Sequence, residues 1–332
     1  MFLSFHHRDI LSITPKYRIT SYTSDSLLTN MVNTSPYVLP LDQPVVALDC
    51  TSAFNALTGQ EKKYAHYLSR AAWNGGLVVL VQTSPESPLI HSLLHRIFIE
   101  KPLSEIKKTA LDDAALSEDE FKAILIYLSG IITNTGNYKG FGDTKFIPGL
   151  PKEKFEAFVK HSAAYRNNPS LFQSIWAKVS DSLYSLKDNE KSLGFCGKGI
   201  TTYFSGNCTV EDGNLVNEFL RYKSILAYNT RACKTVKNGI SHFEVRLASA
   251  ETNKEIAAAE EFKGAYFTVV HGDYSPIMKL VSENLLKAKD YAANEGEKHM
   301  LEYYSKSFLS GNIADHMEGS RYWIKDKGPV IE

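Results

Sequence analysis

The sequence predicts an α+β fold, in which helices and strands occupy separate stretches of the chain. Apolar residues recur at helical spacing through residues 51–186, and β-branched and aromatic runs follow between residues 199 and 273. Two more helical stretches come next. Because helices and strands are grouped instead of alternating, we expect an α+β architecture in preference to a doubly wound parallel sheet.

The N-terminal half is expected to be helical. Its predicted helices are residues 51–73, 88–98, 118–133, 152–165 and 170–186. The first should stop at the glycine pair Gly75-Gly76, since glycine commonly follows a helix end. Ser117 followed three residues later by Glu120 is a capping-box pattern, which predicts the start of the third helix.

The next part of the chain has the composition of strands. The runs rich in β-branched and aromatic residues are residues 199–207, 227–236, 242–249 and 265–273. Turn residues separate them. Ser275-Pro276 then supplies an N-cap and a proline for a new helix. After a second helix, Arg321–Asp326 alternates polar and apolar side chains, which predicts a half-buried final strand.

The bulk composition excludes some classes of protein. Hydrophobic residues make up 43% of the 332 residues, and 37 basic residues balance 37 acidic ones. Without a basic surplus we expect no nucleic-acid partner. No apolar run approaches the ~20 residues that span a bilayer, so we expect no membrane partner. The four cysteines form no CxxC pair, which favours buried thiols and a cytoplasmic location.

The first forty residues stand apart from the rest. They are rich in serine and threonine, carry two acids among three bases, and contain Pro15. A disordered extension and a targeting leader both remain open for residues 1–40. The folded region is expected to cover residues 41–332.

Three motifs suggest chemistry at first sight. His91 and His95 share a helix face, but Ser92 stands where the HExxH metal motif has glutamate, so we expect no metal site. The glycines of residues 194–199 precede a predicted strand, not a helix, which indicates a hairpin connection instead of a phosphate loop. Cys208 is expected to be a buried thiol.

The loop at residues 133–151 is a stronger candidate. It contains four glycines and also aromatic and polar residues. Those residues are Asn137, Tyr138, Lys139, Phe141, Asp143 and Lys145. A long loop that carries aromatics either packs against the core or binds a ligand, and both interpretations remain open here.

The same loop carries a family resemblance. The stretch NYKGFGDTKFIPGLPKEK, residues 137–154, resembles the N-terminal lobe of the dipeptidyl peptidase III family. Further blocks follow in the family's order up to the end of the chain. They are residues 64–88, 198–212, 227–231, 244–249, 272–277, 287–294 and 319–332. The resemblance covers the chain from about residue 39 onward.

The resemblance implies one lobe of a two-lobed zinc exopeptidase that removes dipeptides from oligopeptides. The lower lobe would be a helical N-terminal part packed on a small, incomplete five-stranded β-barrel. The upper lobe would hold zinc through the two histidines of an HExxGH motif and a glutamate of an EECRAE-like motif. The glutamate of the HExxGH motif and the metal would together activate water. An extended oligopeptide would bind along the barrel as an added strand.

The chain departs from the family at the zinc motifs. None of its ten histidines precedes a glutamate, and no EECRAE-like run occurs. We therefore expect no catalytic residue and no zinc in this chain, which would be truncated before the zinc-binding lobe and inactive without it. The alternative is a genuine short protein, a non-catalytic module that binds peptides or another partner.

The resemblance also implies the substrate contacts. Phe141 and Trp323 stand where the family has cleft aromatics. Asn137, Tyr138 and Asp143 are expected to contribute through their position in the loop. Gly140 replaces a residue that is often serine, so one hydrogen bond to substrate would be lost. Packing in the core remains the alternative for each of these residues.

Overall fold

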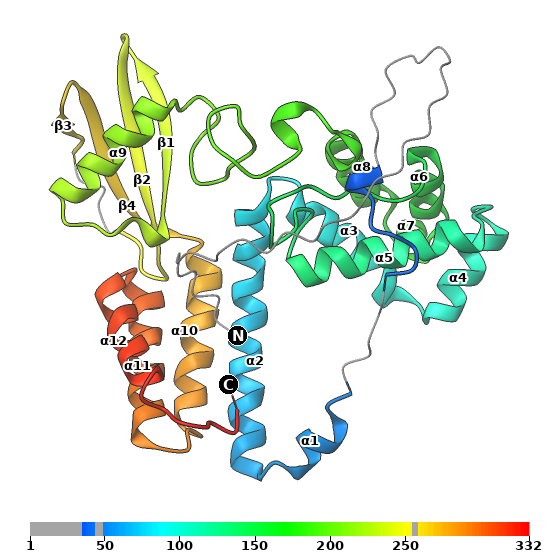
Figure 1. The fold of residues 1–332 in the computed structure, drawn as a ribbon, viewed down its shortest axis with the longest axis horizontal. Helices are drawn as coiled ribbons and strands as arrows, with labels where there is room; N and C mark the ends of the chain where they lie inside the picture. Colours follow the sequence, from blue (N-terminus) through cyan, green and yellow to red (C-terminus); the bar gives the residue numbers. More distant parts are fainter. Residues whose placement is uncertain (1–34, 44–48, 254–257, 332) are drawn as a thin grey trace, which may run out of the picture.

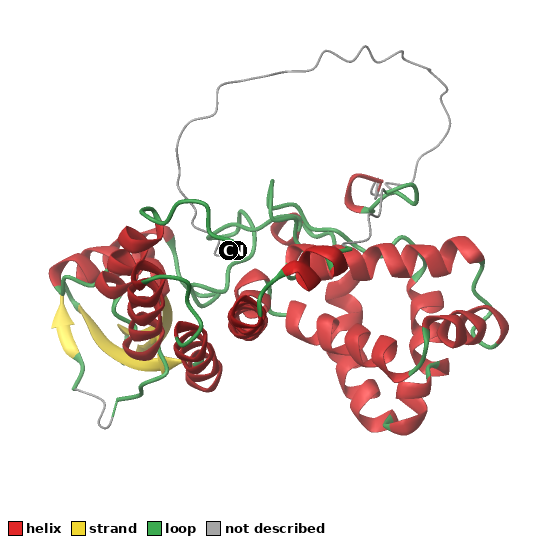
Figure 2. Cartoon of the chain, turned by 90° about the horizontal axis from the view of Figure 1, so that it is seen from below, coloured by secondary structure: helices red, strands yellow, loops and turns green. Residues whose placement is uncertain are grey.

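A computed structural model describes residues 35–43, 49–253 and 258–331, so most of the predicted leader lies outside the described residues. Figure 1 shows a helical bundle, a small sheet, and a layer of long helices between and below them. Figure 2 shows the strands at one end of the molecule and the helical bundle at the other. The α+β class is confirmed.

The N-terminal half is helical as predicted. Its helices are α1 (Thr51–Ala56), α2 (Gly59–Thr83), α3 (Ser87–Glu100), α4 (Leu103–Asp112), α5 (Glu118–Asn134), α6 (Lys152–His161), α7 (Ala163–Asn167) and α8 (Pro169–Tyr184). The capping box is confirmed at α5, where Ser117 Oγ accepts from Glu120 N at 3.2 Å. Phe155 of α6 stacks on Trp176 of α8 at 5.6 Å between ring centroids, inside the bundle core.

The prediction of one helix over residues 51–73 is confirmed at its start, Thr51, but is wrong in its continuity and at its end. A new helix begins at Thr58, whose Oγ1 accepts from Glu61 N at 3.3 Å, while Glu61 Oε2 accepts from Thr58 N at 2.7 Å. That helix, α2, then continues through Gly75 and Gly76 to Thr83. Packing explains this, because Gly75 lies against Val281 of another helix, and tertiary contact overrides the low helix propensity of glycine.

The sheet has four strands among the described residues. They are β1 (Thr230–Lys237), β2 (Ile240–Ala248), β3 (Glu260–Phe262) and β4 (Ala265–Asp273), in the order β1-β2-β4-β3. The β2–β4 pair is parallel, and the two outer pairs are antiparallel. The expected five-stranded barrel is not confirmed, because this sheet is open.

One helix covers the inner face of the sheet. Phe219 of α9 (Val210–Tyr222) stacks on Phe267 of β4 at 4.1 Å between ring centroids. The buried cluster around this contact consists of Cys208, Val216, Phe219, Leu220, Ala232, Phe243, Val245, Leu247, Ala265 and Phe267. The expectation that the helical N-terminal part packs on the strands is not confirmed, since the cover at this contact comes from α9, a later helix.

Two predicted strands are wrong. Residues 199–207 are irregular, and Phe204 makes only an isolated bridge to Ala232 of β1. Arg321–Asp326 is no strand either, because α12 (Ile313–Trp323) runs into it. Tyr322 of that helix stacks on Tyr303 at 5.9 Å between ring centroids. Four alternating residues fit one helix turn as well as a short strand, so the pattern could not decide.

A layer of long helices completes the molecule. It contains α10 (Ser275–Lys289), α11 (Glu295–Ser310) and α12, which Figure 1 shows beside α2 and below the sheet. Their shared buried cluster includes Tyr64 of α2, Leu285 of α10 and Leu301 of α11. Ser275 is the first helical residue and not the N-cap, because Tyr274 occupies the cap in the left-handed region.

Candidate functional site

A short hairpin lies within the glycine-rich loop after α5. Tyr138 and Lys145 pair across its base, and Lys139 N donates to Thr144 O at 2.9 Å. The tip turns through Gly142 at φ +91° and Asp143 at φ +53°. Glycine and aspartate tolerate this left-handed region better than most residues, so the sequence suits the turn.

Phe141 stands at the tip of the hairpin. Its side chain is 93% exposed, the largest exposed fraction among the exposed large hydrophobic residues that the structure describes. The backbone beside it is fixed, since Gly140 N donates to Asn134 Oδ1 at 2.9 Å. Leu193 N likewise donates to Asp143 O at 2.9 Å. The ring is thus presented to solvent from a held backbone, and the Asp143 side chain is exposed next to it.

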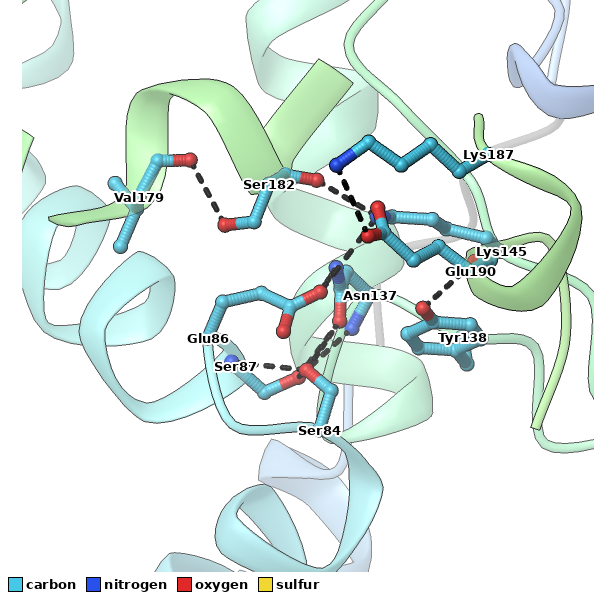
Figure 3. Close-up of polar contacts among 10 residues, drawn as sticks. All are labelled: Ser84, Glu86, Ser87, Asn137, Tyr138, Lys145, Val179, Ser182, Lys187 and Glu190. Carbon is cyan, nitrogen blue, oxygen red and sulfur yellow. Dashed lines mark hydrogen bonds and ion pairs between the residues drawn. The ribbon is translucent and has the colours of Figure 1, made fainter. Parts of the chain in front are cut away.

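Asn137 lies behind the hairpin and does not reach solvent (Figure 3). Its Oδ1 accepts from the hydroxyls of Ser84 and Ser87 at 2.7 and 2.8 Å. Its Nδ2 donates to Glu86 Oε1 at 2.9 Å. Every polar group of this amide therefore has a partner at the start of α3, and the residue supports the loop from within.

Tyr138 is also buried, at 1% exposed. Its hydroxyl donates to Glu190 O at 2.8 Å, and burial raises its pKa well above the usual range. Lys145 fills the space beside its ring, with Nζ 5.7 Å from the ring centroid. Burial lowers the pKa of the Lys145 ammonium, while Glu86 and Glu190 oppose that shift.

A cavity of about 500 Å³ adjoins the hairpin. Its apolar lining includes Leu193, Phe195, Ile200, Tyr203, Phe204 and Leu220. Leu193 joins the two features, because its N–H binds Asp143 O and its side chain lines the cavity. Sequence reasoning missed this cavity, since residues 199–207 have strand composition but fold as an irregular wall.

The structure does not bring Trp323 to the hairpin. The hairpin is tied to the last residue of α2, where Thr83 Oγ1 donates to Thr135 O at 2.9 Å. Trp323 ends α12, and Asp326 just beyond it lies near Tyr64. The 19 residues from Tyr64 to Thr83 rise about 28 Å along α2. Trp323 is 45% exposed.

Comparison with known proteins identifies the family. Residues 175–332 match peptidase family M49. The chain is 46% identical over 305 residues to dipeptidyl peptidase 3 of Rattus norvegicus and of Homo sapiens. The chain belongs to peptidase family M49. It is also 37% identical over 296 residues to dipeptidyl peptidase 3 of Dictyostelium discoideum.

The M49 chain spans 41% of the length of these relatives, while the match to each covers 89% of the chain itself. No helix in the part of the chain that the structure describes is long and apolar enough to cross a membrane.

The residues present do not fit the zinc ion that the M49 resemblance implies. His91 and His95 stack with ring centroids 5.6 Å apart, and burial together with His95 lowers the pKa of His91. Within the described residues, no three histidine, cysteine or acidic side chains gather as a metal site. Two imidazoles without further ligands do not make a zinc centre.

The other two candidate motifs of the sequence, the glycine run of residues 194–199 and Cys208, show no arrangement for phosphate binding or nucleophilic chemistry. The glycine loop is a tight turn, in which Gly194 N donates to Ile200 O at 2.8 Å, and no helix follows it directly. Cys208 is buried, with Sγ 3.5 Å from Ser205 Oγ.

Proposed function

We propose that this M49 chain forms part of the peptide-binding cleft of a zinc-dependent dipeptidyl peptidase, which removes dipeptides from the N-terminus of oligopeptides. The observation that supports the proposal is Phe141, which stands 93% exposed on a fixed hairpin. The chain around it is 46% identical to proteins named dipeptidyl peptidase 3. An exposed aromatic ring on a hydrogen-bonded backbone can bind peptide side chains with little loss of backbone conformational entropy.

The residues of the site would divide into contacts and supports. Phe141 would contact the side chains of the bound peptide, and Asp143 would face it from the same tip. Asn137 and Tyr138 would act from behind, since their polar groups already have protein partners. Trp323 would be a separate peptide contact, away from the hairpin and nearer the N-terminal part of α2.

We assign the zinc ligands of the whole protein to residues that this sequence does not contain. Neither an HExxGH motif nor an EECRAE-like run occurs in it. The residues completing the five-stranded barrel, and the upper lobe as a partner, would also come from elsewhere. The chain alone would therefore bind peptides without cleaving them. A cytoplasmic location stays a proposal that rests on the absence of CxxC pairs. The expectation of buried thiols is wrong for Cys50 and Cys196, which are exposed.

A second candidate is a non-catalytic peptide-binding module that functions by itself. It is favoured by the covered edge of β1, where Ser205 N donates to Ala232 O at 3.0 Å and Asn207 Nδ2 donates to Lys234 O at 3.1 Å. A sheet edge whose groups are already paired does not recruit further strands.

The purified chain should bind a free-amino hexapeptide of alternating alanine and phenylalanine, measured by calorimetry, yet release no dipeptide from it. Mass spectrometry of the incubated peptide, with zinc added and with a chelator added, checks the second point. Chelator-sensitive dipeptide release would show that this chain holds a zinc site, and absence of binding would contradict the cleft assignment. Restoration of cleavage by a separately produced upper lobe of a relative would exclude the second candidate.

A further inference from the structure

Lys145 is a buried cation at the base of the Phe141 hairpin. Its side chain is 1% exposed, and Nζ donates to Ser182 O at 2.6 Å. The same Nζ lies 3.6 Å from Glu86 Oε1, whose side chain is itself only 11% exposed. Figure 3 shows the ammonium between these groups and beside Tyr138. Lysine is seldom buried in this way unless it is paired.

The ammonium connects segments that are far apart in the sequence. Ser182 belongs to the last turn of α8, where carbonyl oxygens lack helical partners and the helix dipole is negative. Glu86 directly precedes α3. The backbone N of Lys145 adds a third connection, because it donates to Lys191 O at 2.9 Å. The hairpin base is thus tied to α3, to α8 and to the segment after α8.

Filling this space with a charged side chain costs free energy of desolvation. A methionine of similar length would occupy the volume without the cost of removing an ammonium from water. A charge, however, requires its acceptors at definite positions, whereas an apolar side chain packs in several ways. A buried ion pair can therefore specify one arrangement without adding stability. The hairpin that Lys145 holds carries Phe141 four residues earlier.

We propose that Lys145 is the positioning residue of the Phe141 hairpin, fixing the backbone from which the ring is presented. Its contribution to peptide binding rests on the proposed function, while its contribution to the order of the hairpin does not. Asn137 assists from the same cluster, since it shares Glu86 with Lys145.

Hydrogen exchange of the whole chain tests the positioning directly. In a Lys145→Met variant, the amides of Lys139, Lys145 and Leu193 should exchange about tenfold faster, a loss of about 1.4 kcal/mol in local opening. Amides of α10 should be unchanged. The matched control is Lys152→Met, because Lys152 also pairs with α8, through Asp181, but lies outside the hairpin. Equal hairpin exchange in the two variants would overturn the proposal.

A milder variant covers the case in which Lys145→Met does not fold. Glu86→Gln keeps an amide oxygen for Asn137 and removes the negative charge that faces Lys145. The same hairpin amides should then exchange about threefold faster, because one of two acceptors of the ammonium becomes neutral. Unchanged exchange in a folded Glu86→Gln protein would likewise overturn the proposal.

Peptide binding separates positioning from general destabilisation. For the alternating hexapeptide, Lys145→Met should weaken the affinity about fivefold in the wild-type background but not in a Phe141→Ala background. Equal weakening in both backgrounds would show that Lys145 does not act through Phe141. If the wild-type chain binds no peptide, the proposed function fails, and hydrogen exchange still decides whether Lys145 holds the hairpin.

Discussion

At the scale of single residues, side chains close together in one loop differ completely in their exposure to solvent. Tyr138 and Phe141 are three residues apart, yet the first is 1% exposed and the second 93% exposed. The left-handed turn at Gly142 and Asp143 directs the chain back after Phe141, so that Lys145 can return to the interior. The base of the hairpin is therefore buried, while its tip is exposed to solvent.

Replacing Phe141 tests its role as a contact. Phe141→Ala should weaken binding of the alternating hexapeptide about tenfold, or about 1.4 kcal/mol, because an exposed anchor ring is lost. Thermal stability should stay within ~0.5 kcal/mol, since the ring packs on little. The matched control is Trp73→Ala, which removes a 70% exposed aromatic from α2. Equal affinity in the two variants would contradict the assignment.

Sequence reasoning reached the site only in part, and the reason differs between residues. The loop could be selected from its glycines and aromatics, and Phe141 within it from the family resemblance. The supporting role of Asn137 could not, because the hydroxyls that donate to its Oδ1 lie some fifty positions earlier, at Ser84 and Ser87. Lys145 gave no signal at all, since a buried and an exposed lysine look alike in sequence.

At the scale of elements, sequence pattern predicted helices and strands where local interactions decide the structure. The runs of β1, β2 and β4 were recognised from composition, and β4 begins and ends where predicted. The end of α2 was misplaced, because the contact that carries the helix past Gly75 comes from α10, about two hundred residues later. The strand β3 was missed, since three residues are too few for a period-two pattern.

Replacing glycine by alanine should change the stability of the fold in opposite directions at a helical position and at a position of positive φ. Gly76 is helical, and a Cβ added there meets no atom within 4 Å, so Gly76→Ala should stabilise the fold by ~0.5–1 kcal/mol. Gly136 has φ +145°, and its Cβ would overlap Thr83 and Ser87. Gly136→Ala should therefore destabilise by more than ~1 kcal/mol. Urea unfolding of both variants checks this, and two changes of the same sign would refute it.

At the scale of the whole molecule, the described residues form three buried clusters instead of one core. One lies in the helical bundle, one under the sheet, and one among α2, α10 and α11. Figure 1 shows α2 between the bundle and the α10–α12 layer. Because α2 contacts α3 of the bundle and packs on α10, it connects the helical bundle to the α10–α12 layer.

Because the buried residues form separate clusters, a core substitution should reduce protection from hydrogen exchange in its own cluster and not in the others. Leu285 is fully buried between α10 and its neighbours, and Leu285→Ala should cost ~2–5 kcal/mol by leaving a cavity. Hydrogen exchange should show lost protection in α10 and α11 with α8 retained, since α8 belongs to another cluster. An equal loss in α8 would show that the chain unfolds as one unit.

The length of α2 has a consequence for ligand size. The rise from Tyr64 to Thr83 on α2 is about 28 Å, and an extended peptide advances about 3.3 Å per residue, so a peptide lying along that rise would need eight or nine residues. A tetrapeptide seated on one aromatic cannot touch the other. Under the proposed function, only oligopeptides of at least that length would contact both Phe141 and Trp323.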